Sequence, residues 1–238
     1  MLQTSNDLRL AIWDVDGTLV DSRAVIQACM EAAFRATGLP PPEYDATRKI
    51  VGLSLHAGIA HLAPADIGAV RLEFLVDAYR QTFTRLRADP CLQEPMYDGA
   101  LEVLDRLKND GWLLAIATGK THRGLDGLFA KHPIKSYFDT VWCADDGPGK
   151  PHPFMVEQSM RALGCAPSQS LMIGDAIHDI AMGRAAGVRS LGVSWGFGRA
   201  DELRDAGADE VHHDFAGLQK SLDAFEPSAD DLTESYPE

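Results

Sequence analysis

The chain has 238 residues, with 35 Asp and Glu against 22 Lys and Arg, which gives a formal net charge of −13 at pH 7. This acidic balance argues against a general binder of nucleic acid or of an anionic membrane, because either activity would need a basic patch. No apolar stretch approaches the ~20 residues that cross a bilayer, and the opening "MLQTSNDLRL" lacks the basic and apolar regions of a signal peptide. We therefore expect a cytoplasmic protein, monomeric or homodimeric, with no nucleic-acid or membrane partner.

The first predicted element is a buried strand over residues 8–15, which carries two aspartates in "AIWDVDGTLV". Like charges held this close repel, so Asp14 and Asp16 must be hydrated, paired or bound to a metal. A strand that ends in an ordinary Asp-Gly turn would also explain them. The remainder of the sequence has to distinguish these two interpretations.

Helical spacing predominates from residue 22 to about residue 91, and no segment there is typical of a strand. In "SRAVIQACMEAAFRATG", Ser22 is a candidate N-cap and Gly38 marks the end of the helix. The later segment "RLEFLVDAYRQTFTRL" has one apolar face, formed by Leu72, Leu75, Val76, Tyr79 and Phe83. This region is predicted to be an all-helical insert after the first strand.

From residue 97 onward, helical and strand patterns alternate. The segments "WLLAIAT", "TVWCA", "SLMIG" and "RSLGVSW" are predicted strands, and helical segments such as "DGALEVLDRLKNDG" and "IHDIAMGRAAG" separate them. Continuous apolar runs of this kind are typical of strands buried on both faces. The alternation predicts an α/β fold with a parallel sheet flanked by helices.

Polar residues follow four of the predicted strands. They are Asp14 and Asp16, then Thr118, Gly119 and Lys120, then Lys150 in "GKPHP", and finally Asp175 and Asp179 in "GDAIHD". In parallel sheets, functional residues collect outside the carboxyl ends of the strands. Taken singly, Lys150 could be a solvated lysine, and Asp175 and Asp179 could be a helix cap and a first-turn acid. Their ordered combination favours a functional site.

Each of these residue types suits phosphoryl transfer. The Asp14 carboxylate could attack phosphorus to form an aspartyl-phosphate, and Asp16 could donate a proton to the leaving oxygen and then activate water. A Mg²⁺ ion takes oxygen ligands, which Asp14, Asp175 and Asp179 could supply. Lys150 would add positive charge, while the Thr118 hydroxyl and nearby backbone N–H groups would bind phosphoryl oxygens.

The motifs "DVDGTL", "ATGK", "GKPHP" and "GDAIHD", in this order and spacing, resemble the four motifs of the haloacid dehalogenase superfamily. The resemblance implies a Rossmann-like core over residues 1–21 and 92–225, and a C1-type helical cap over residues 22–91. Residues 226–238 would be a flexible acidic tail.

The same resemblance implies catalytic roles for Asp14, Asp16, Thr118 and Lys150. It implies substrate contacts from Thr118, Gly119 and Lys150. A magnesium site would be formed by Asp14, Asp175 and Asp179, with the backbone carbonyl of Asp16 as a further ligand.

Among subfamilies, the chain looks most like phosphoglycolate phosphatases, because "KIVGLSL" in the cap is of the kind found there. We expect a Mg²⁺-dependent phosphomonoester hydrolase that acts on a small metabolite. We expect little volume beneath a helical lid, and 2-phosphoglycolate is then the leading candidate substrate. Arg48 and Lys49 are candidates to bind its carboxylate, although both could equally be solvated helix charges.

Two alternatives remain open. A β-phosphoglucomutase-like enzyme usually has arginine after the cap motif G-x-S, where this chain has Leu55. A non-catalytic phosphate-binding relative would normally lose one of the motif carboxylates or the lysine, and this chain retains all of them.

Overall fold

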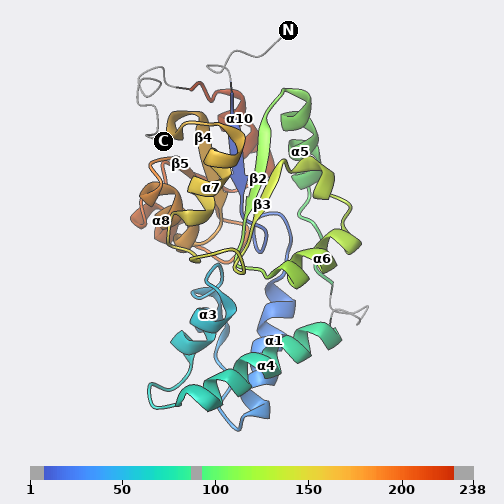
Figure 1. Ribbon diagram of the computed structural model, residues 1–238, viewed down its shortest axis with the longest axis vertical. Coiled ribbons are helices and arrows are strands. Elements are labelled where there is room, and N and C mark those ends of the chain that lie inside the picture. Colours follow the sequence, from blue (N-terminus) through green and yellow to red (C-terminus); the bar gives the residue numbers. More distant parts are fainter. Residues whose placement is uncertain (1–7, 87–92, 228–238) are drawn as a thin grey trace.

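The computed structural model describes residues 8–86 and 93–227 (Figure 1). Its central sheet contains β1 (Leu10–Trp13), β2 (Leu113–Ala117), β3 (Thr140–Trp142), β4 (Ser170–Gly174), β5 (Arg189–Val193) and β6 (Glu210–His212). All neighbouring strands are parallel, and their order is β3-β2-β1-β4-β5-β6. The predicted α/β class is confirmed.

Helices cover both faces of this sheet. The helices of the core are α5 (Ala100–Asn109), α6 (His122–Lys131), α7 (Phe154–Leu163), α8 (Ile177–Ala185), α9 (Ala200–Asp205) and α10 (Phe215–Asp223), with short 3₁₀ turns at η2 (Lys135–Tyr137) and η3 (Pro167–Gln169). Apolar side chains of α5 and α10 contact one face of the sheet, and those of α7 and α8 contact the other. The central strands β1 and β2 are accordingly apolar at every position.

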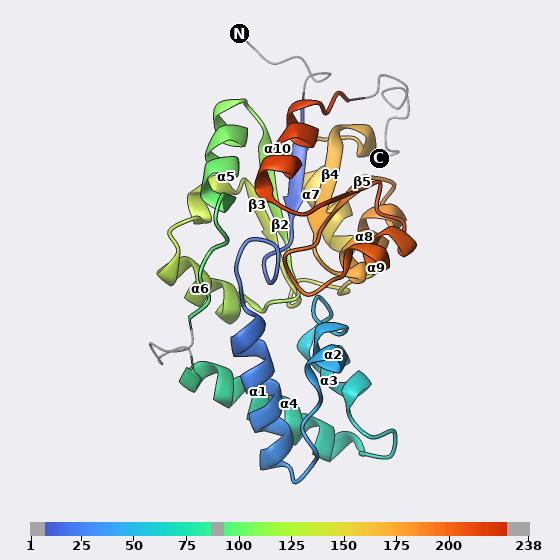
Figure 2. The same ribbon diagram turned by 180° about the vertical axis from the view of Figure 1, so that it is seen from behind.

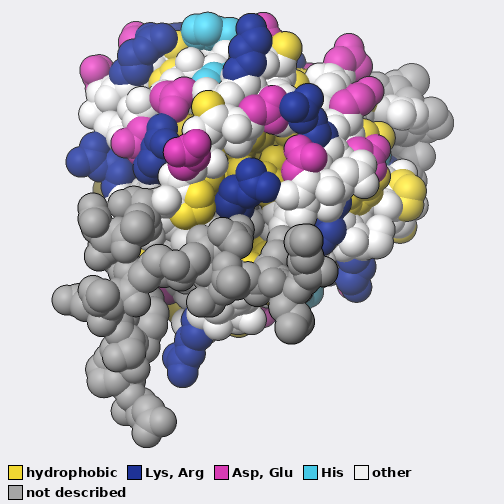
Figure 3. All heavy atoms as spheres, turned by 90° about the horizontal axis from the view of Figure 1, so that it is seen from above, with side chains coloured by type: hydrophobic (Ala, Val, Ile, Leu, Met, Phe, Trp, Pro, Cys, Tyr) yellow, Lys and Arg dark blue, Asp and Glu magenta, His cyan; other side chains and the backbone are white. Residues whose placement is uncertain are grey.

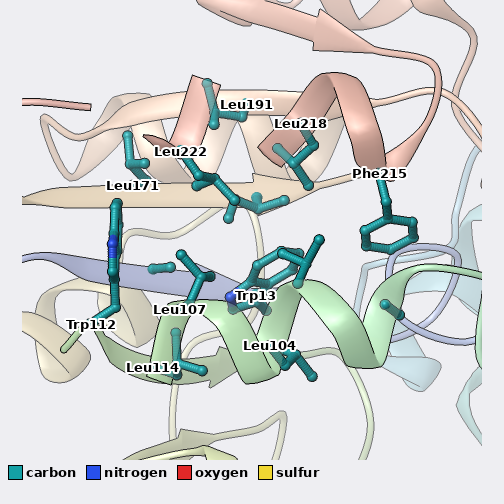
Figure 4. Packing of buried hydrophobic residues seen from close by; sticks show 14 of the residues in the cluster. Trp13, Leu104, Leu107, Trp112, Leu114, Leu171, Leu191, Phe215, Leu218 and Leu222 are labelled. Carbon is teal, nitrogen blue, oxygen red and sulfur yellow. The ribbon is translucent and has the colours of Figure 1, made fainter. Parts of the chain in front are cut away.

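Strand β1 shows how the alternation of side chains places the sheet between the two layers. Ala11 and Trp13 belong to the apolar cluster on the α5 and α10 side, whereas Leu10 and Ile12 belong to the cluster on the α7 and α8 side. Figure 4 shows Trp13 between side chains of α5 and α10. All four β1 residues are fully buried, so the strand is anchored firmly where its chain leads into the predicted site.

A second group of helices lies at one end of the sheet (Figures 1 and 2). It consists of α1 (Arg23–Ala36), α2 (Tyr44–Arg48), α3 (Leu55–Leu62) and α4 (Ala69–Leu86), which lie between β1 and β2 in the sequence. We call these four helices the cap. Between residues 23 and 86 the cap contains helices only, and Leu75, Val76 and Tyr79 of α4 lie in its buried cluster as the predicted apolar face requires.

Ser22 is the N-cap residue of α1, as predicted, but its side chain does not cap the helix. Its φ of −98° and ψ of 5° are not the extended values of a capping residue, and its side chain makes no cap hydrogen bond. The Asp21 carboxylate instead accepts from the backbone N–H of Arg23 at 3.2 Å. The last part of the predicted cap, residues 87–91, and most of the predicted tail, residues 228–238, lie outside the described residues.

Within the described ranges, no helix is long and apolar enough to span a bilayer. The end of the core that faces away from the cap carries basic and acidic side chains side by side (Figure 3). Mixed charges of this kind do not create the one-sign field that polyanion binding requires.

Candidate active site

The turn after β1 brings Asp14 and Asp16 to the end of the sheet that faces the cap. The backbone N–H of Asp14 donates to the carbonyl of Ile173 at 2.9 Å, which extends the pairing with β4 by one residue. Gly17 follows with φ +85°, and a Cβ there would lie 2.2 Å from an Asp175 carboxylate oxygen. Only glycine fits this turn, because its backbone is left-handed and the Asp175 side chain occupies the space of a Cβ.

Lys150 joins two of the predicted carboxylates. Its Nζ lies 2.5 Å from Asp14 Oδ1 and 2.6 Å from Asp179 Oδ1, and all three side chains are at most 2% exposed. Burial raises the pKa of Asp14 to about 7, even though the Lys150 ammonium opposes this shift. The Lys150 ammonium therefore offsets only part of the cost of burying the Asp14 charge.

Asp175 and Asp179 are held by hydrogen bonds of the core. The Asp175 carboxylate accepts from the Thr18 hydroxyl at 2.9 Å and from the Phe197 N–H at 2.7 Å. Burial, together with neighbouring Asp14 and Asp179, raises the pKa of Asp175 well above its ordinary value. Asp179 Oδ2 accepts from the N–H of Ala176, the N-cap of α8, so its capping role and its place in the site coexist.

These carboxylates fit a divalent cation. Oxygens of Asp14, Asp175 and Asp179 lie within 4.8 Å of one another, and all three residues are buried. Asp14 Oδ2 is buried with no hydrogen-bond partner among the described residues. Three buried carboxylates beside one lysine, with one oxygen unpartnered, are a suitable ligand set for a hard cation. The Asp16 side chain does not belong to this cluster.

The loop after β2 contributes Thr118, Gly119 and Lys120. Thr118 is fully buried, and its Oγ1 accepts from the Lys120 N–H at 3.3 Å. The Lys120 ammonium lies 2.7 Å from Asp16 Oδ1 and 3.6 Å from Glu94 Oε1. The sequence predicts that Lys120 lies at this strand end, but it indicates no role for this residue. Its pairing with Asp16 could have been inferred only from the shared edge of the sheet.

The cap touches the core directly at this loop. A Cβ on Gly119 would lie 2.7 Å from the carbonyl oxygen of Leu53 and 2.9 Å from that of Gly52, both in the cap. On the other side of the site, the His178 ring is hydrogen-bonded to the Lys49 carbonyl at 2.9 Å. The cap therefore lies closed against the residues that follow β2 and β4.

Arg48 and Lys49 lie at the cap–core boundary in different surroundings. The Arg48 guanidinium is 5% exposed and lies 2.6 Å from Glu202 of α9 and 2.7 Å from Asp45. The Lys49 side chain is exposed and lies 3.7 Å from Asp45. Arg48 thus links the cap to the core, and the substrate contact expected of Lys49 stays a prediction.

A cavity of about 740 Å³ opens between the cap and the core. It reaches Asp14 and Asp16 at one end and is bounded by α1, α3, α4 and α6. The expectation of a small volume beneath the lid is therefore wrong, because the space left between cap and core depends on packing that sequence patterns do not reveal.

Comparison with known proteins identifies the family of the chain. The family model described as "Haloacid dehalogenase-like hydrolase" matches residues 11–193. The chain belongs to this family. It is 33% identical over 198 residues to "Probable phosphatase IndB" of Dickeya dadantii, with 83% of this chain and 86% of that protein covered. It is 32% identical over 222 residues to a phosphoglycolate phosphatase of Agrobacterium fabrum, with 90% and 91% covered.

Among solved structures, a hydrolase from Pseudomonas syringae superposes with a TM-score of 0.80 at 28% identity, covering 91% of this chain and 98% of that one. The resemblance to the haloacid dehalogenase superfamily that the four motifs predicted is thus confirmed. This haloacid dehalogenase-like hydrolase is a phosphatase, as its homologues are.

Proposed function

We propose that this phosphatase hydrolyses phosphomonoesters with Mg²⁺ as cofactor and Asp14 as nucleophile. The observation that carries the proposal is the difference between the two aspartates after β1. Asp14 is buried beside Lys150, whereas the Asp16 side chain is 14% exposed at the cavity and paired with Lys120. Two carboxylates in different surroundings can take two different roles.

In the first step, an oxygen of Asp14 attacks phosphorus and the bond from phosphorus to the ester oxygen breaks. Asp16 gives its proton to the departing alcohol. In the second step, Asp16 takes a proton from water, whose oxygen attacks phosphorus and releases inorganic phosphate. Asp14 is then regenerated as a carboxylate, and Asp16 is again protonated.

The remaining residues would bind the phosphoryl group. We assign the Thr118 hydroxyl, the Gly119 N–H and the Lys150 ammonium to its oxygens, since donors aimed there stabilise charge that develops during transfer. Asp14, Asp175, Asp179 and the Asp16 carbonyl would hold Mg²⁺, which supplies positive charge to the phosphate. The division into a core (1–21 and 92–225) and a cap (22–91) belongs to the same proposal.

The test is to trap the phosphorylated enzyme. Asp16→Asn, mixed with p-nitrophenyl phosphate and Mg²⁺ and quenched in acid, is expected to accumulate phosphate on the peptide that contains Asp14. Asp14→Asn serves as the matched control and should accumulate none. Mass spectrometry that finds the phosphate on another residue, or a wild-type enzyme that releases no phosphate from any ester, would contradict the proposal. 2-Phosphoglycolate, the predicted substrate, is the reference compound for these assays.

A further inference from the structure

The cavity under the cap has a chemical character that the catalytic residues do not explain. It begins at Asp14 and Asp16 and continues between cap and core for about 740 Å³ while the cap already lies against Gly119. Cavities of roughly 300–1,000 Å³ enclose ligands of drug size. A two-carbon acid such as phosphoglycolate would leave most of this space unfilled.

The wall that the cap contributes is largely apolar. Its apolar lining includes Ile26, Met30, Val51, Leu53, Tyr79 and Phe83. Tyr79 and Phe83 lie one helical turn apart on α4 with their rings nearly parallel, at 6.2 Å between centroids and 12° between planes. Both residues line the cavity, and the Lys120 ammonium lies 5.6 Å from the centre of the Phe83 ring. An apolar group that lies against these rings would be removed from water. This removal is the main source of apolar binding energy.

Most of the cationic side chains of the lining are already paired with carboxylates: Lys120 with Asp16, Arg80 with Asp77, and Lys131 with Glu94. Arg123 instead donates to the neutral Thr84 hydroxyl at 3.3 Å. Arg48, one of the two carboxylate binders expected from the sequence, is held by Glu202 and does not line the cavity. A second anionic group on the substrate would have to displace one of these three ion pairs or bind Arg123 beside Thr84.

We infer that the substrate is a phosphomonoester whose alcohol part is an apolar body, an alkyl chain or aromatic ring, lying against Tyr79 and Phe83. This rests on the proposed function, because the phosphate must lie at Asp14 for the ester group to extend into the cavity. The core then acts on the phosphoryl group, and the cap selects the body attached to it.

A series of unbranched alkyl phosphates, from ethyl to octyl, tests this inference. The acidity of the leaving alcohol hardly changes along the series, so differences in kcat/KM report on binding of the chain. Each buried methylene contributes about fourfold, and we expect kcat/KM to rise by about that factor per carbon until the cavity is filled. Hexyl phosphate should exceed 2-phosphoglycolate by at least about tenfold.

The outcomes separate this inference from the proposed function. Hydrolysis of all esters with no rise along the series, or with 2-phosphoglycolate preferred, overturns the inference and leaves the phosphatase mechanism intact. An absence of hydrolysis for every ester overturns the proposed function and this inference with it.

Two variants on α4 sharpen the test. Phe83→Ala removes one of the two rings that line the cavity, and we expect the hexyl-to-ethyl ratio of kcat/KM to fall about tenfold. Phe74→Ala is the matched control, because Phe74 is 58% exposed on the same helix and does not line the cavity. Its ratio should equal that of the wild type. Equal ratios in both variants, with helical content preserved by circular dichroism, would remove Phe83 from the binding surface and overturn the inference.

Discussion

The core and the cap line the same cavity with different kinds of side chain, charged groups from the core and mostly apolar groups from the cap. On the core side, carboxylates and ammonium groups lie 2.5–2.7 Å apart, as between Lys150 and its two partners and between Lys120 and Asp16. On the cap side, most contacts would be apolar, from residues such as Val51 and Tyr79. If bond breaking belongs to the core and substrate choice to the cap, as we propose, the two should respond separately to substitution.

The largest expected effect comes from the core. Asp14→Asn keeps the shape of the side chain but removes the nucleophile, so kcat should fall by at least about 10³-fold. The loss should be the same for ethyl and hexyl phosphate, because the cap is untouched. Steady-state phosphate release measures it, with mass spectrometry to show that the asparagine has not deamidated. A large residual rate would contradict covalent catalysis by Asp14.

Removal of the metal should also abolish activity, and the loss should be the same for every ester substrate. Chelation should stop phosphate release, and added Mg²⁺ should restore it. Ca²⁺ should bind but inhibit, because the larger ion takes more ligands at longer distances and misdirects Asp14. Either cation should raise the melting temperature, since it binds only where the buried carboxylates of the folded chain converge. Full activity in a chelator would count against the metal site.

A smaller effect is expected where the two regions are joined. Arg48→Met removes the ion pair with Glu202, and KM should rise about fivefold with little change in kcat, since one partly exposed pair contributes ~1 kcal/mol or less. Arg35→Met is the control, because Arg35 pairs with Glu31 within α1 and is 61% exposed. A KM that changes equally in both variants would deny Arg48 a role in closing the cap.

The pH dependence of this link follows from its charges. Arg48 lowers the pKa of Glu202 from its ordinary 4.5 to about 2. A lowered acid pKa adds stability above the unfolded value, and this stability is lost as the pH falls through the folded value. The ion pair is thus complete at neutral pH, so KM measured between about pH 6 and 8 should show no change from this source.

The core as far as β5 was readily predicted because its information is local, whereas α9, β6 and α10 were not predicted. The run "SLMIG" coincides with β4, and Gly164 and Gly187 follow α7 and α8 with the positive φ that the helix ends require. The strand ends then placed Asp14, Thr118, Lys150 and Asp175 together, since parallel strands share one functional edge.

What could not be predicted depends on contacts between distant segments. Arg48 and Glu202 are separated by 154 residues, and no periodicity reveals that they meet. The pairing of Lys120 with Asp16 depends on how two loops bend. The cavity volume depends on how the cap packs against the core, which no motif specifies. Sequence patterns therefore indicate helices, strands and the functional edge of the sheet, but not the spaces between these elements.

The position of β1 in the middle of the sheet has a consequence for chain synthesis. Trp13 is paired with Ile116 on one side and with Ile173 on the other, so its neighbours emerge from the ribosome long after it does. Until β4 has been made, the strand before Asp14 and Asp16 is an apolar segment without its final partners, a situation that favours aggregation. The helices of the cap are contiguous in sequence, so they can form their local contacts before β4 has been synthesised. Asp14, the proposed nucleophile, is thus synthesised before both of the strands that hold β1 in place.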